Sequence, residues 1–115
     1  MTTLYEGRHT GEYLLSEAPG TLSREEITVI QTGVALASGT VLGKITASSK
    51  YVPYSNAASN GSEVAAGVLY SSLPAFTGDK KAVAHVRLAE VSAAELTGSD
   101  VAGVADLKAL FILVR

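Results

Sequence analysis

The chain has 115 residues, a formal net charge of −2 and no cysteine. This length predicts a single domain, because two independent cores would be hard to build from so few residues. The hydrophobic fraction of 47% excludes extensive disorder, which needs low hydrophobicity and high net charge. The chain also lacks the basic footprint of proteins that bind nucleic-acid backbones, so we expect no nucleic-acid partner. The lack of cysteine excludes disulfides and thiolate metal sites.

Residues 1–22 are expected to form a flexible N-terminal arm, because glycine and proline interrupt them and no regular period persists. Four apolar or aromatic side chains stand out in this arm: Tyr5, Tyr13, Leu14 and Leu15. In a wholly solvated tail such side chains would stay exposed to water, whereas in an arm that pairs with a partner they can be buried. Two interpretations therefore stay open, a frayed terminus and a partner-binding arm.

The rest of the chain, residues 23–115, is predicted to fold as a β-rich domain. Alternating or nearly continuous apolar runs, separated by turn signals, predict strands within 26–29, 40–46, 50–54, 63–73 and 82–90. Gly43 inside the second run predicts a bulge or a close backbone contact. Pro53 cannot donate a ladder hydrogen bond, so its strand should lie at a sheet edge or end there.

Helical signals appear only near the C-terminus. Ser92 and Glu95 have capping-box spacing and predict a short helix at 92–96, and Asp100 can cap a second helix that ends near residue 107. The residues expected on one face of that second helix are Val101, Val104 and Ala105. The β-prone run at 111–114 should insert into the sheet, since an exposed run would invite aggregation. The predicted fold class is therefore α+β and mostly β, with one or two short helices near the C-terminus.

No segment has the pattern of a targeting signal or a membrane span. The N-terminal residues lack the apolar stretch of a secretory signal. The longest strongly apolar run, Ala109–Val114, is far shorter than the ~20 residues of a membrane helix. We therefore expect synthesis in the cytoplasm and no membrane partner.

Few groups in the chain could support catalysis. The two histidines, His9 and His85, lie far apart in sequence, and His85 stands among apolar strand residues, which is more typical of a structural histidine. We expect no enzyme activity, no metal and no cofactor. Two alternatives stay open: a small ligand-binding β domain with a groove near Tyr51 and Tyr54, and a small hydrolase built around His85.

Five short motifs follow one another along the chain. They are ASGTVLGKI at 37–45, KYVPY at 50–54, GSEVAAGVL at 61–69, VRLAEV at 86–91 and the terminal LVR. In this order they resemble the head decoration proteins of lambda-like tailed phages. The resemblance runs over 23–91 and 107–115, which is most of the chain.

The resemblance implies a small domain of the β-clip type and a structural function. Three copies would form a homotrimer over the threefold positions on the outside of an expanded phage capsid, and would cement the shell against the pressure of packaged DNA. The N-terminal arm would order on the major capsid protein by adding a strand to it. The residues expected to contact the capsid are Tyr5, Tyr13, Leu14 and Leu15. The residues expected near the trimer contacts are Tyr51, Pro53 and Tyr54, with ordinary packing as the alternative for the two tyrosines.

Overall fold

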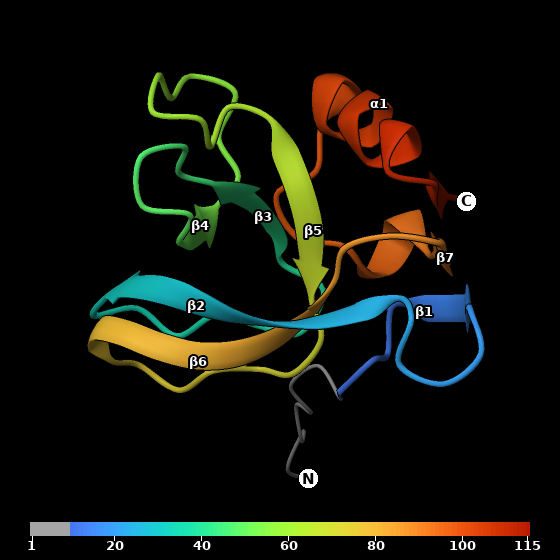
Figure 1. Cartoon of the computed structure of the whole chain (residues 1–115), viewed down its shortest axis with the longest axis horizontal. Helices are drawn as coiled ribbons and strands as arrows, with labels where there is room; N and C mark the ends of the chain where they lie inside the picture. The colour runs from blue at the N-terminus through green and yellow to red at the C-terminus, as the bar shows by residue number, and fades with distance from the viewer. Residues whose placement is uncertain (1–9) are drawn as a thin grey trace, which may run out of the picture.

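Five strands close into a barrel in the computed structural model, which describes residues 10–115 of the chain (Figure 1). Around the barrel they lie in the order β2 (Arg24–Thr32), β4 (Tyr51–Pro53), β3 (Val41–Lys44), β5 (Ala65–Leu69) and β6 (Thr77–His85). β2 and β6 pair antiparallel over nine residues each, with Arg24 opposite His85 at one end of the ladder. This ladder therefore determines which side chains meet at that end of the barrel.

A second sheet joins the two ends of the described chain. Its strands are β1 (Leu14–Glu17), β7 (Ala89–Val91) and β8 (Ile112–Val114), in that order. The central strand β7 is antiparallel to β1 and parallel to β8. The prediction that the C-terminal apolar run enters a sheet is confirmed. Within residues 10–115, no strand pairs with the outer edge of β1.

Two short helical elements connect β7 to β8 (Figure 1). The rest of the regular structure is β-strand, which confirms the predicted class, mostly β with short helices near the C-terminus. η1 (Ala93–Glu95) is a 3-10 turn, and the side chain of the preceding Ser92 forms no capping hydrogen bond. α1 (Val101–Ala109) begins as predicted, because the Asp100 carboxylate accepts a hydrogen bond of 2.6 Å from the Gly103 N–H.

The face that α1 buries differs from the predicted one. Val101, which was expected to pack, is 90% exposed, whereas Gly103 and Leu107 are buried. A Cβ atom at Gly103 would lie 3.0 Å from Cε2 of Tyr54, so the helix approaches the domain through its smallest residue. Sequence periodicity missed this face because it counts apolar side chains and gives glycine no weight.

Two clusters of buried apolar side chains form the core. The first draws on the barrel strands and their flanks, and it comprises Ile27, Val29, Leu42, Tyr51, Leu69, Leu73, Ala84 and Val86. The second joins the barrel to the second sheet and α1, and it comprises Tyr13, Val41, Tyr54, Ala65, Val68, Val91, Leu96, Leu107 and Ile112. The second cluster holds both ends of the described chain against the barrel.

Gly43 in β3 and Pro53 in β4 both shape the hydrogen-bond ladders of the barrel. The register between β3 and β5 shifts at Gly43, which confirms the predicted bulge or close contact. The strand that contains Pro53 was predicted either to lie at a sheet edge or to end at this residue. β4 does end at Pro53, but it lies between β2 and β3 and not at an edge. Only Tyr51 of β4 pairs with β2, so the missing N–H of Pro53 does not interrupt that ladder.

Candidate functional site

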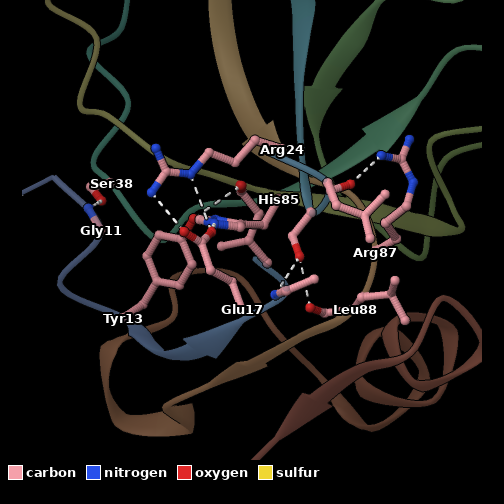
Figure 2. A network of polar contacts seen from close by, with 12 residues as sticks. Gly11, Tyr13, Glu17, Arg24, Ser38, His85, Arg87 and Leu88 are labelled. Carbon is pink, nitrogen blue, oxygen red and sulfur yellow. Dashed lines mark hydrogen bonds and ion pairs between the residues drawn. The ribbon is translucent and has the colours of Figure 1, made fainter. Parts of the chain in front are cut away.

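A network of polar side chains anchors the segment around β1 to the barrel, as Figure 2 shows. The Glu17 carboxylate accepts two hydrogen bonds from Arg24, of 2.8 and 3.1 Å, and lies 2.5 Å from Nε2 of His85. The other ring nitrogen of His85, Nδ1, is hydrogen-bonded to the Tyr13 hydroxyl. We call Tyr13, Glu17, Arg24 and His85 the latch, because they join β1 and the residue before it to β2 and β6.

The register of the barrel explains why the latch forms. The β2–β6 ladder places Arg24 directly opposite His85, so both side chains are available to a carboxylate that arrives from β1. The Arg24 guanidinium also lies 4.3 Å from the ring centre of Tyr70, and this ring meets His85 edge-on at a centroid distance of 5.4 Å. Together these contacts leave the His85 side chain fully buried.

The hydrogen bonds of the latch select one tautomer of the neutral imidazole of His85. A carboxylate only accepts hydrogen bonds, so Nε2 of His85 donates to Glu17, and Nδ1 accepts from the Tyr13 hydroxyl. Burial lowers the pKa of His85, although the hydrogen bond to Glu17 opposes this shift. The hydrogen bond from Arg24 holds the pKa of Glu17 below its ordinary value. Both ring nitrogens are therefore engaged inside the protein, which suits a structural histidine rather than a general base.

Acid is expected to weaken the latch in two steps. Folding lowers the pKa of His85 below its ordinary value of 6.5, so its contribution to stability is present above pH 6.5 and decreases as the pH falls toward the folded pKa. Folding also lowers the pKa of Glu17, so the contribution of its carboxylate is present above pH 4.5 and is lost as the pH falls further. Urea unfolding across this range should show both steps, and His85→Gln should abolish the upper one. Equal wild-type stability on both sides of pH 6.5 would contradict this account.

Residues 10–22, which were expected to belong to a flexible arm, are packed on the domain in this structure. β1 pairs with β7, and the Ala18 N–H donates a hydrogen bond of 2.9 Å to the hydroxyl oxygen of Ser23. The physical reason is the latch, in which the carboxylate of Glu17 meets His85, a barrel residue 68 positions further along the chain. The flexible arm over residues 1–22 stays a prediction, and its first nine residues lie outside the described residues.

The expected capsid-contact residues are placed very differently from one another. Tyr5 lies outside the described residues. Tyr13 is fully buried as a member of the latch and the core, and Leu14 is half-buried against the same core cluster. Leu15 is 54% exposed, beside a register irregularity between β1 and β7. Of the three that the structure describes, Leu15 is thus the one whose side chain is mostly available to a partner.

The expected trimer-contact residues do not form one surface cluster. Tyr51 and Tyr54 are both buried, and they belong to different core clusters. The Tyr54 hydroxyl donates a hydrogen bond of 2.8 Å to the Asp100 carboxylate, and burial raises the pKa of Tyr54 to about 12. Pro53 is exposed at the end of β4. These contacts fit the alternative of ordinary packing for the two tyrosines, and they do not bring both rings to one groove.

Two exposed apolar side chains that sequence reasoning missed lie close together at the turns before β7 and β8. Leu88 is 41% exposed and Phe111 is 68% exposed. Both have left-handed backbone conformations, with φ of 52° and 61°, which bulky residues rarely adopt. The N–H of Ala89 donates to the Phe111 carbonyl at 3.1 Å, so the two turns are hydrogen-bonded neighbours. We call Leu88 and Phe111 the ridge.

A hollow lies on each side of the ridge. The barrel hollow has a volume of about 540 Å³, and its lining includes Lys44, Val64, Val86, Arg87 and Phe111. The sheet hollow has a volume of about 290 Å³, and its lining includes Glu17, Leu88, Glu90, Leu113 and Phe111.

Across residues 10–115, no group of three or more histidine, aspartate or glutamate side chains is arranged to hold a metal ion. In the same part of the chain, no helix has the length and hydrophobicity needed to span a membrane.

A mostly-β domain with an anchored edge strand and an exposed apolar ridge has the features of a structural or binding protein. A family model described as Bacteriophage lambda head decoration protein D matches residues 3–112 of the 115-residue chain. The chain belongs to this family, which confirms the resemblance seen in its motifs and assigns it a role in decorating a phage capsid. The family is one of structural virion proteins rather than enzymes. No curated protein and no solved structure matches the chain significantly.

Proposed function

We propose that the chain binds as homotrimers at threefold positions on the outside of the expanded phage head and stabilises the shell against the pressure of packaged DNA. The proposed partners are the major capsid protein and two further copies of the chain, after synthesis in the host cytoplasm. The observation that carries the proposal is the placement of β1. This edge strand is fixed to the domain by the latch, and it directly follows the N-terminal residues of the expected arm.

Strand addition is the binding mode that β1 supports. The unpaired backbone groups along a sheet edge can accept a strand of another protein, while neighbouring side chains set the register. Leu15 supplies such a side chain beside the edge of β1. A strand of four residues binds weakly alone, but a trimer presents three copies at once, and such linkage can raise avidity about 10²–10⁴-fold.

Co-sedimentation with expanded, undecorated capsids of the encoding phage or prophage tests this proposal. The wild-type chain should pellet and saturate at one trimer per threefold site. Removing residues 1–9 or introducing Leu15→Asp should each weaken binding by at least about tenfold, because three arms lose contacts together. The truncation stops at residue 9 because removing the whole expected arm, residues 1–22, would also delete Tyr13 and Glu17 and thus the latch.

Val101→Asp is the matched control, since Val101 is 90% exposed and lies on α1, which is not part of the sheet that contains β1. It should bind like the wild type. Wild-type binding by both arm variants would reject strand addition by the arm. No pelleting of the wild type with well-formed expanded capsids would reject the decoration proposal itself.

A further inference from the structure

Asn60 and Gly61, in the loop between β4 and β5, form a dipeptide that has no part in the proposed function (Figure 1). In such a dipeptide the backbone nitrogen of the glycine can attack Cγ, the side-chain carbonyl carbon of the asparagine, and close a five-membered succinimide ring. Glycine leaves the attacking nitrogen unhindered because it has no side chain. The rate in a folded protein depends on how the fold holds the two groups and on which side chains meet them.

The side-chain amide of Asn60 is held by Ser62. The N–H and the hydroxyl of Ser62 both donate to Oδ1 of Asn60, at 3.1 and 2.6 Å. These two bonds turn the Asn60 side chain back over the peptide of Gly61, the residue between them. They also place two donors on the oxygen that becomes negatively charged when Cγ is attacked, as in an oxyanion hole. Ser62 is 3% exposed, so both donors are fixed inside the loop.

The attacking nitrogen of Gly61 is held as firmly. Its N–H donates a hydrogen bond of 2.8 Å to Oε1 of Glu63, so a carboxylate already lies where a general base must take the proton. A Cβ atom at Gly61 would lie 2.7 Å from the Lys44 carbonyl oxygen and from the Thr46 nitrogen, so this backbone is packed against the end of β3. The Thr46 N–H also donates at 3.0 Å to the Asn60 carbonyl. One tightly packed loop therefore brings together a nucleophile, a base and two oxyanion donors.

We propose that Asn60 is a self-modification site, at which the folded loop promotes conversion of the asparagine to aspartate or isoaspartate. Glu63 takes the proton of the Gly61 N–H while the nitrogen bonds to Cγ of Asn60, and Ser62 stabilises the oxyanion that forms. The Cγ–Nδ2 bond then breaks, and Nδ2 leaves as ammonia with the proton that Glu63 received. Asn60 is exposed, so ammonia can escape and water can enter. Water opens the succinimide at either of its two carbonyl groups, which gives the two products.

The modification should loosen the loop. Both products replace a neutral amide with a carboxylate close to Glu63, so like charges are brought together. Isoaspartate also adds one methylene to the main chain, and this lengthens the segment that holds Gly61 against Thr46. Because the Ser62 backbone contacts Gly43 in β3, the disturbance reaches the barrel. We therefore expect the modified chain to unfold at a lower temperature than the unmodified chain.

A comparison of the folded wild-type chain with the same chain unfolded in urea tests the inference without any substitution. Peptide mapping by mass spectrometry locates the modified asparagine and measures its fraction over time at neutral pH. The folded chain should react at least about tenfold faster, because the base and the oxyanion donors act only when the loop is formed. A folded chain that reacts no faster than the unfolded one would overturn the inference.

Two substitutions test the roles of the named side chains. Glu63→Gln and Ser62→Ala should each slow the folded reaction by at least about tenfold and leave the rate in urea unchanged. Glu26→Gln is the matched control, because Glu26 is a carboxylate on β2 whose side chain is 70% exposed. This variant should react at the wild-type rate. A rate in folded Glu63→Gln equal to or above that of the wild type would overturn the inference.

Asn56, in the same loop, is an internal control. It is also exposed, but alanine follows it and its side-chain amide donates at 3.0 Å to the Asp100 carboxylate. It should stay unmodified in samples in which Asn60 reacts, and equal rates at the two asparagines of the folded chain would contradict a site built at Asn60. None of these measurements involves capsids, so this inference and the proposed function can fail independently.

Discussion

His85→Ala is expected to lower the free energy of unfolding by about 3 kcal/mol or more. The His85 side chain is fully buried, and both of its ring nitrogens are hydrogen-bonded. Its removal leaves a cavity between the rings of Tyr13 and Tyr70, which both meet the imidazole edge-on. It also leaves the Tyr13 hydroxyl with only its 3.4 Å contact to the Val68 carbonyl, so a buried polar group loses its better partner.

The loss should be concentrated at β1. Glu17 keeps its hydrogen bonds to Arg24, but this pair is partly exposed and is expected to hold the strand less firmly alone. Amide hydrogen exchange should therefore accelerate in residues 10–22 more than in β3 or β5. The same change should weaken capsid binding if β1 must be held in place to present the arm.

Arg87→Ala is the control for His85→Ala. Arg87 pairs with Glu25 at 3.3 Å and donates a hydrogen bond of 2.7 Å to the Leu22 carbonyl, both at the surface, so its loss should change the unfolding free energy by about 1 kcal/mol. Urea unfolding of both variants at neutral pH measures the difference. Equal effects of the two substitutions would show that the latch does not stabilise the fold.

The role of His85 was only partly predictable from the sequence. A lone histidine among apolar strand residues correctly indicated a structural position. Its partners could not be predicted, because Tyr13 and Glu17 lie 72 and 68 residues away in the chain and meet it only through the barrel register. For the same reason Tyr13 was expected to be a surface contact, although it is a core residue.

The ridge shows a second limit of local sequence patterns. Phe111 was assigned to the C-terminal strand because it begins a β-prone run, yet β8 begins at Ile112 and Phe111 lies in the turn before it. Bulky apolar residues normally avoid left-handed backbone conformations, so the backbone preference of phenylalanine argues against the turn that Phe111 adopts. Gly43 is the opposite case, because a glycine inside a strand signals a close contact in any fold. The sequence cannot say which segment makes that contact.

Gly43→Ala is expected to destabilise the domain by about 3 kcal/mol. A Cβ atom at this position would lie 2.4 Å from the carbonyl oxygen of Ser62 and 2.7 Å from its Cα, and these are backbone atoms that cannot rotate away. Ser62 is itself buried and fixed, since its N–H donates to Asn60 at 3.1 Å and its carbonyl accepts from Ser55 at 3.2 Å. Either β3 or the loop must therefore shift.

A shift of β3 would spread through the barrel, because β3 is hydrogen-bonded to β4 on one side and to β5 on the other. Gly98→Ala is the matched control: Gly98 has φ of 83° but no atom within 4 Å of the added Cβ, so only backbone strain of about 1 kcal/mol is expected. Thermal and urea unfolding compare the two variants. Equal stability of Gly43→Ala and Gly98→Ala would mean that the loop at Ser62 moves away at little cost. The close contact with Ser62 would then not be the reason for a glycine in β3.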